Sequence, residues 1–369
     1  MGLTLNSMLA CGHGILPALR RACPPIIFLV MQKILALISK GLPLWVILGA
    51  SAAYLWPQAF QWTSWPLSHL LGGFLVDEHP ASATSRFDLV GQKTVSWMFA
   101  LTMFTVGTVI EPKNFVVLAS RPRAVFFGLL TQFSVMPALA WMTASLGGFD
   151  SNVTLGFVIV GCAPGAMTSN VLTYLARGDT AYSVTLTTFA SVLSVILTPL
   201  LVGWIGGGEL GVSAQNFWDQ LWTIAWTVAL PLLLGIGTRL ALPCGRRLYD
   251  AASPAIAVVA IVFICCFVIQ WTREDLASAT GAIFLGVVFM NAMGFVLGGL
   301  LGRLYRLSRP QQITLSIEIG MQNAGIGVVL AATTFTDRKA VAIPAALFAI
   351  WCILTASGLI ALLKRRAKK

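Results

Sequence analysis

Long apolar runs dominate this sequence and restrict what the chain can fold into. A helix of about 20 mostly apolar residues crosses the hydrocarbon core of a bilayer. Only 10% of the 369 residues are charged, whereas soluble domains carry about a quarter. The sequence therefore predicts an all-α polytopic membrane protein with ten spans. They lie at 41–60, 94–111, 121–146, 152–176, 181–206, 217–240, 253–271, 278–302, 311–335 and 340–363.

Lysine and arginine are distributed unequally between the two sides of the predicted bundle. The side with both termini and the connections after even-numbered spans carries 19 of them, and the other side carries 5. Cytoplasmic loops are enriched in these residues, so both termini are expected to be cytoplasmic. The sequence then divides into a cytoplasmic segment at 1–40, a ten-helix domain at 41–364 and a basic tail at 365–369. The longest connection ends in a polar insertion at 77–92, which is expected to be exposed.

The net charge of +11 raises the question of a nucleic-acid partner. The basic residues lie between apolar runs, however, and form no basic motif with interleaved aromatic residues. This pattern is typical of loops that face anionic lipid headgroups. We therefore expect membrane lipid, and no nucleic acid, beside these residues.

The ten predicted spans divide into two sets of five, at about 41–206 and 217–363. An odd number of spans in each half gives the halves opposite orientations, which makes an inverted repeat. The fourth span of each half is interrupted by glycine and polar residues, as PGAMTSN at 164–170 and EIGMQNAGIG at 318–327. Two matching interruptions indicate a binding site near the middle of the membrane.

Glu318 is the only one of the thirteen acidic residues that falls well inside a predicted span. An ionised side chain at that depth costs about 2.5 kcal/mol or more unless it has a partner. No lysine or arginine is placed inside a span to neutralise it. A bound cation or a proton must supply the missing positive charge, so Glu318 is the centre of the candidate site.

Neutral oxygen-bearing side chains surround the two interruptions. Individually they have ordinary structural roles, because Ser and Thr often bond the carbonyl four residues back and a buried Gln can join two helices. Together with a carboxylate and freed backbone carbonyls they form an all-oxygen set, which suits Na⁺ better than a transition metal. The residues are Gln132, Ser169, Asn170, Ser183, Thr187, Gln322 and Asn323.

Both interrupted segments resemble the signature segments of the bile acid:sodium symporter family. They are GCAPGAMTSNVLTYLARGDTAYSVTLTT at 161–188 and IEIGMQNAGIGVVLAA at 317–332, and FTVGTVIEPKNF at 104–115 resembles the end of that family's second span. The resemblance extends from Leu42 to Arg365 and is that of a bacterial-type member, which places the chain in the bacterial inner (plasma) membrane. It implies ten helices in two inverted five-helix repeats. Spans 1, 2, 6 and 7 would form a panel, and the other six a core in which spans 4 and 9 are broken and cross.

The resemblance also implies two sodium ions and a substrate position. One ion would be held by Ser169, Asn170, Ser183, Thr187 and Glu318. The other would be held by Gln132, Glu318, Gln322 and the backbone carbonyls of Ile319 and Met321. Substrate would contact Asn323 and the backbone around Met167 and Thr168. Ala166 and Met167 depart from the family pattern, since many members have a second glycine and a small polar residue there; both departures bear on anion recognition.

The residues and the resemblance together predict a sodium-coupled symporter that imports an organic anion by alternating access, and not an enzyme. The anion is bile-acid-like, a pantoate or a keto acid, and the oligomeric state is open. Three alternatives stand beside this interpretation: proton coupling or efflux on the same fold, an intramembrane enzyme, and a ligand-binding sensor. The oxygen set argues against a proton carrier, no catalytic constellation accompanies Glu318, and no soluble signalling domain is present.

Overall fold

The chain is described by a computed structural model, and the described residues are almost entirely helical. Their only β-structure is an isolated antiparallel bridge between Gly165 and Gln322. Six of their helices are long and apolar enough to cross a membrane, so the chain is a polytopic integral membrane protein. The expected segment at 1–40 and residues 77–82 of the polar insertion lie outside the described residues. The described ranges are 41–56, 83–111, 120–208, 210–242, 245–274 and 281–367.

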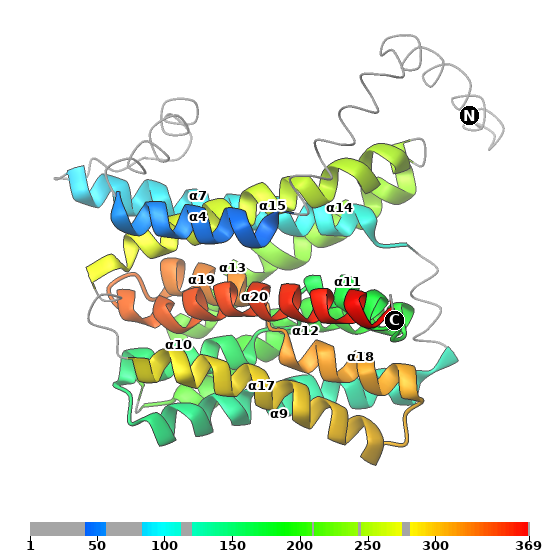
Figure 1. Ribbon diagram of the computed structural model, residues 1–369. Helices are drawn as coiled ribbons and strands as arrows, with labels where there is room; N and C mark the ends of the chain where they lie inside the picture. Colours follow the sequence, from blue (N-terminus) through cyan, green and yellow to red (C-terminus); the bar gives the residue numbers. More distant parts are fainter. Residues whose placement is uncertain are drawn as a thin grey trace, which may run out of the picture.

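One layer of the molecule lies at the top of Figure 1, where α4, α7, α14 and α15 are labelled. In this layer α7 packs against α14 and α15, and α15 packs against α4. The contact between α7 and α14 is made at two glycines, Gly107 and Gly235. A Cβ on Gly107 would lie 2.2 Å from the carbonyl oxygen of Leu232. Small residues allow membrane helices to approach this closely. The helices are α4 (Leu42–Leu55), α7 (Ala83–Val109), α14 (Leu230–Ala241) and α15 (Arg246–Trp271).

A buried arginine joins three helices of this layer. Arg239 of α14 is 4% exposed. Its guanidinium donates to the carbonyl oxygen of Thr108 at 2.7 Å and to Asp250 Oδ1 at 2.8 Å, and a third contact reaches Glu111 Oε1 at 3.5 Å. Because a buried cation needs such partners, the end of the FTVGTVIEP segment serves here to hold α7 against α14 and α15.

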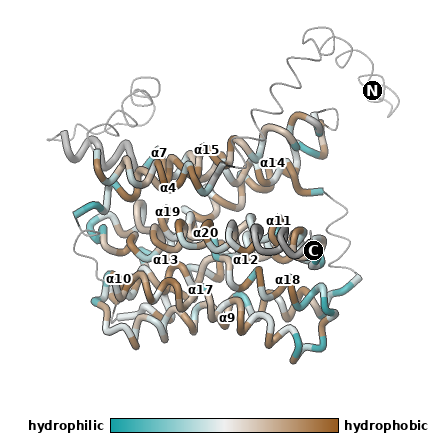
Figure 2. Tube along the Cα trace, viewed as in Figure 1, coloured by the Kyte–Doolittle hydropathy of each residue, from teal (hydrophilic) through white to brown (hydrophobic). Residues whose placement is uncertain are grey.

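The remaining long helices form a thicker group beneath this layer (Figure 1). Within it, α17 packs against both α9 and α18, and α10 packs against α9 and α12. Figure 2 shows mostly hydrophobic residues along the helices and hydrophilic residues gathered at their ends. The members are α9 (Pro122–Gly147), α10 (Ser151–Cys162), α11 (Thr168–Leu175), α12 (Thr180–Gly206), α17 (Gly281–Leu304), α18 (Arg309–Gly320), α19 (Ala324–Thr334) and α20 (Ala342–Ala367).

Two of the predicted spans are each split into two helices, at the positions of the glycine-rich interruptions. The break between α10 and α11 covers 163–167, and the break between α18 and α19 covers 321–323. Proline and glycine explain the first break, because Pro164 lacks the N–H that a continuous helix requires. A milder irregularity interrupts the predicted span at 217–240, where α13 (Ala214–Ile224) continues through the π-turn Ala225–Ala229 into α14.

The start of α7 differs from the expectation. Residues 83–92 were expected to belong to an exposed polar insertion, but they extend α7 by about ten residues at its N-terminal end. The physical reason lies in the local sequence. After Pro80 the chain contains no proline before α7 ends at Val109, so nothing forces the helix to stop at the edge of the apolar run.

Candidate functional site

The two broken segments meet face to face. The backbone N–H of Ala166 donates to the carbonyl of Met321 at 2.7 Å, and the N–H of Asn323 donates to the carbonyl of Pro164 at 2.8 Å. These bonds form the antiparallel bridge between Gly165 and Gln322. A helix break leaves backbone N–H and carbonyl groups without intrahelical partners. Each broken segment therefore supplies hydrogen-bond partners to some of these groups in the other segment.

Side chains from neighbouring helices satisfy the carbonyls that remain. Thr198 of α12 donates its hydroxyl to the carbonyl of Cys162 at 2.7 Å, and Asn291 of α17 donates to the carbonyl of Gly320 at 2.7 Å. An unpaired buried carbonyl is costly, so these contacts stabilise the two breaks. Sequence reasoning missed both residues. The only signal available was Asn291 itself, an isolated amide in an otherwise apolar span.

Glu318 lies at this crossing and is 2% exposed. Three hydroxyl groups donate to its carboxylate: Ser169 to Oε2 at 2.6 Å, Ser183 to Oε2 at 3.1 Å, and Thr187 to Oε1. The predicted common face of Ser183 and Thr187 on one helix therefore points at the carboxylate. None of the ion pairs found in the described part of the chain includes Glu318.

Gly165 lies directly against this carboxylate. A Cβ at this position would be 2.6 Å from Glu318 Oε1 and 3.1 Å from Glu318 Cδ. Any side chain there would push Glu318 away from its three hydroxyl partners. The requirement for glycine in this first interruption thus comes from the approach of the carboxylate.

Asn170 and Thr173 extend the set of oxygens along α11. Asn170 Oδ1 lies 3.4 Å from the hydroxyl of Thr187. Thr173 is fully buried and donates to Ser183 Oγ at 3.4 Å. Thr173 was not among the expected residues, although it lies four residues after Ser169 and so on the same face of the helix.

A second group of oxygens lies on the α9 side of the crossing. Gln132 Nε2 donates to the carbonyl of Ala163 at 3.1 Å and to Gln322 Oε1 at 2.8 Å, and Gln322 Nε2 donates to the carbonyl of Ile319 at 3.0 Å. Gln132 is 2% exposed, and its Oε1 has no hydrogen-bond partner among the described residues. A buried acceptor without a donor is available to a cation. The Met321 carbonyl accepts one bond from Ala166 and keeps a second lone pair.

The expected substrate contacts also converge on the crossing. Met167 and Thr168 lie at the start of α11, and Asn323 directly precedes α19. The other layer reaches this point through Phe99 of α7, whose Cε2 would lie 2.4 Å from a Cβ on Gly325. Two half-helix N-termini and a helix of the other layer therefore meet around these residues.

Comparison with known proteins gives a matching family and several relatives. Residues 97–279 match the profile of the Sodium Bile acid symporter family. The chain is 29% identical over 340 residues to "Uncharacterized sodium-dependent transporter YocS" of Bacillus subtilis, covering 92% of this chain and 96% of that protein. It is 28% identical over 332 residues to "Probable sodium/metabolite cotransporter BASS1, chloroplastic" of Arabidopsis thaliana, covering 90% and 75%.

A more distant similarity is found in animals. The human "Ileal sodium/bile acid cotransporter" is 26% identical over 247 residues, covering 66% of this chain and 70% of that protein. The matched profile includes the first interrupted span, with Gly165 and the hydroxyls that reach Glu318. From these matches it follows that the chain belongs to the sodium bile acid symporter family.

Proposed function

We propose that this protein is a Na⁺-coupled symporter that imports an organic anion by alternating access. The observation that carries the proposal is the buried Glu318 carboxylate, which accepts three hydroxyl hydrogen bonds. It has no cationic side chain as a partner among the described residues. A carboxylate at this depth needs a positive charge, and an all-oxygen surrounding is suited to Na⁺.

Two ions can be placed with the residues present. The first is coordinated by Glu318 and the side-chain oxygens around it when the hydroxyl protons rotate away and expose their lone pairs to the ion. The second uses Glu318 together with Gln132 Oε1, the acceptor that has no other partner. The first ion's ligands are Ser169, Asn170, Ser183, Thr187 and Glu318, and the second ion's are Gln132, Glu318, Gln322 and the carbonyls of Ile319 and Met321.

Sodium binding is proposed to assemble the substrate site. The first ion joins α11, α12 and α18, and so fixes the two broken segments relative to each other. The N-termini of α11 and α19, with Met167, Thr168 and Asn323, then present N–H groups and a partial positive charge to an anion. Two Na⁺ ions moving down 100 mV supply about 4.6 kcal/mol, and a co-transported monoanion cancels about half of this.

The architecture proposed for transport is ten spans in two inverted repeats, at 41–206 and 217–363. The layer of α4, α7, α14 and α15 acts as the panel, and the other long helices act as the core that carries the ions. Movement of the core against α7 exposes the crossing to one side and then to the other. We place the protein in the plasma membrane with both termini in the cytoplasm, which follows from the distribution of basic residues.

The nature of the anion is proposed from the family. The names of the relatives point to metabolites and bile acids as transported compounds, and a carboxylate is common to the compounds we expect. Proton coupling is disfavoured by the hydroxyl donors around Glu318, because charge-assisted hydrogen bonds stabilise the ionised carboxylate that a proton carrier must neutralise.

The proposal is tested by uptake into proteoliposomes. Radiolabelled pantoate, pyruvate and taurocholate are offered with an inward gradient of Na⁺ or of K⁺. We expect at least one compound to accumulate with Na⁺ alone, and Glu318→Gln to abolish accumulation. The control is Glu274→Gln, which removes an exposed carboxylate three residues after the end of α15 and is expected to leave uptake unchanged. Equal uptake in Na⁺ and K⁺ would refute sodium coupling, and outward-only transport would support efflux instead.

A further inference from the structure

Oxygen-bearing residues continue from Glu318 toward the basic end of the molecule. They come from three helices. Within each helix they are four residues apart, so they lie on the same face of that helix and about 6 Å apart along its axis. This arrangement goes beyond the ligands proposed for the two ions. We call it the oxygen column; its members are Ser169 and Thr173 of α11, Asp179, Ser183 and Thr187 of α12 and its cap, and Thr314 and Glu318 of α18.

The steps of the oxygen column are linked by hydrogen bonds. Below the carboxylate, Thr173 donates to Ser183 Oγ at 3.4 Å. The N–H of Ser183 donates to the carbonyl of Asp179 at 3.0 Å, and the N–H of Asp179 donates to Thr314 Oγ1 at 2.9 Å. Thr173, Ser183 and Thr314 are each 0% exposed. Buried oxygens therefore lie at successive turns between Glu318 and Asp179, and the Thr314 hydroxyl lies 3.3 Å from the Asp179 carbonyl oxygen.

The turn between α11 and α12 lies tightly against the column. A Cβ on Gly178 would be 2.8 Å from both Thr173 Cγ2 and Thr314 Oγ1. The N–H of Gly178 donates to the carbonyl of Thr173 at 2.9 Å. Gly178, which the proposed ion sites do not use, thus lies directly against two members of the column.

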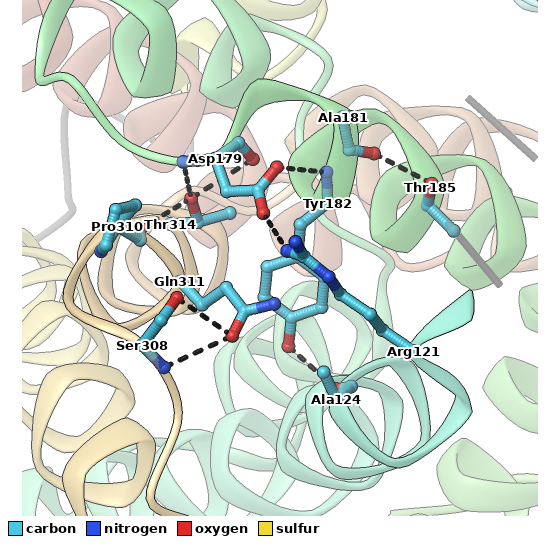
Figure 3. Close-up of polar contacts among 10 residues, drawn as sticks. All are labelled: Arg121, Ala124, Asp179, Ala181, Tyr182, Thr185, Ser308, Pro310, Gln311 and Thr314. Carbon is cyan, nitrogen blue, oxygen red and sulfur yellow. Dashed lines mark hydrogen bonds and ion pairs between the residues drawn. The ribbon is translucent and has the colours of Figure 1, made fainter. Parts of the chain in front are cut away.

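An ion pair closes the end of the column (Figure 3). Arg121 Nη1 donates to Asp179 Oδ2 at 2.9 Å, while Asp179 Oδ1 caps α12 by accepting from the N–H of Tyr182 at 3.0 Å. The Asp179 side chain is 19% exposed and that of Arg121 is 55% exposed. Asp179 is thus the carboxyl group at which the column reaches solvent.

This ion pair is easily opened. An exposed guanidinium is hydrated whether or not it is paired, so the pair adds little to stability. The contact between α9 and α12 has a separate and more buried bond, because Tyr182 Oη donates to the carbonyl of Ala124 at 2.7 Å. Arg121 can therefore leave Asp179 without separating the helices.

We propose that the oxygen column is the path by which Na⁺ leaves Glu318 toward the basic end, and that the Arg121–Asp179 ion pair is its closing contact. The inference rests on the proposed sodium coupling. Hydroxyl and carbonyl oxygens one turn apart replace successive waters of the ion's hydration shell. Movement of Arg121 away leaves the Asp179 carboxylate free to attract the ion outward. Arg121 and Asp179 are positioning residues and are not ligands in the closed state.

The test measures exchange of radioactive sodium by the full-length protein in proteoliposomes with equal unlabelled NaCl on both sides. Arg121→Gln and Asp179→Asn each remove the ion pair, and Asn retains the ability to cap α12. We expect Arg121→Gln to raise the initial exchange rate about three- to tenfold. Asp179→Asn should raise it less, because it opens the closing contact but also removes the carboxylate that attracts the ion. Na⁺ affinity is measured as the NaCl concentration that gives half of the maximal increase in the thermal unfolding midpoint. This concentration should shift less than about twofold, because a gate changes the rates of Na⁺ binding and release by the same factor.

Two controls separate gating from damage to the protein. Arg123→Gln removes the same charge from the same turn of α9, away from Asp179, and is expected to exchange at the wild-type rate. Glu318→Gln combined with Arg121→Gln is expected to return exchange to that of protein-free liposomes, whereas leakage through a damaged protein would persist. Wild-type exchange rates in both ion-pair variants, or persistent exchange in the double variant, overturn the inference. A wild-type protein that NaCl does not stabilise overturns the proposed function itself.

Discussion

Substitution of Gly165 by alanine tests the packing of the proposed sodium site with a single methyl group. The new Cβ would lie 2.6 Å from Glu318 Oε1, and carbon and oxygen atoms that are not bonded do not approach this closely. The backbone of Gly165 is held by the bridge to Gln322. The carboxylate is the more mobile partner, so we expect Glu318 to move away from the first interruption.

The expected effect follows from the hydrogen bonds of Glu318. Its carboxylate is held by three hydroxyls, and a hydrogen bond to a charged group contributes about 1.5–3 kcal/mol. Displacement of Glu318 also moves its carboxylate away from the other proposed ligands of the ion. If this weakens coordination by as much as one such contact, Na⁺ affinity decreases about tenfold to 150-fold. Insertion of a methyl group into a packed interior also lowers stability by about 1–3 kcal/mol.

Thermal unfolding in increasing NaCl, at constant ionic strength with choline chloride, measures both effects. Two glycine variants serve as controls. Gly203→Ala lies on α12 where a Cβ would meet nothing within 4 Å, so neither stability nor Na⁺ response should fall. Gly107→Ala is expected to lower stability through its clash with Leu232 while the Na⁺ response is kept, because it lies in the other layer. An unchanged Na⁺ response in Gly165→Ala would refute the assignment of Glu318 as the shared ligand.

Three other substitutions separate the second ion, the helix breaks and the panel. Gln132→Leu removes the unpaired acceptor, so the Hill coefficient of Na⁺-driven uptake should fall from about 2 to about 1; an unchanged coefficient would exclude Gln132 as a ligand. Asn291→Leu leaves the Gly320 carbonyl unpaired and should lower the free energy of unfolding by about 1–3 kcal/mol; thermal stability equal to the wild type would contradict this. Arg239→Met leaves the Thr108 carbonyl without its donor and should destabilise by about 1–3 kcal/mol without changing the Na⁺ midpoint; a shifted midpoint would show that the two layers are coupled.

Most of the helices and the two breaks could be predicted from the sequence because they depend on local properties. Apolar run length predicts helices that cross a membrane, and proline and glycine interrupt them. Ser183 and Thr187 were expected on one face because residues four apart in a helix always are. The early start of α7 at Ala83 was not predicted, because hydropathy shows where the apolar run ends and not where the helix ends.

The contacts that complete the site could not be predicted in this way. Thr198 lies 36 positions from the carbonyl that it satisfies and is one of several hydroxyl residues on α12, and Asn291 lies 29 positions from its carbonyl as the one amide in an apolar span. Which carbonyl such a residue satisfies depends on how far one helix slides along another, and this follows from packing of the whole bundle. Arg121 and Asp179 are separated by 58 positions, and no spacing rule joins them.

The sequence by itself determined that this chain crosses a membrane and that a lone carboxylate inside it needs a positive charge, from a cation or a proton, since both follow from the energy of placing groups in hydrocarbon. The tertiary structure decided which oxygens reach that carboxylate and why Gly165 must lie beside it. It also decided that the line of oxygens ends at the Arg121–Asp179 pair. These are distances between helices, and they become defined only when the two broken segments cross.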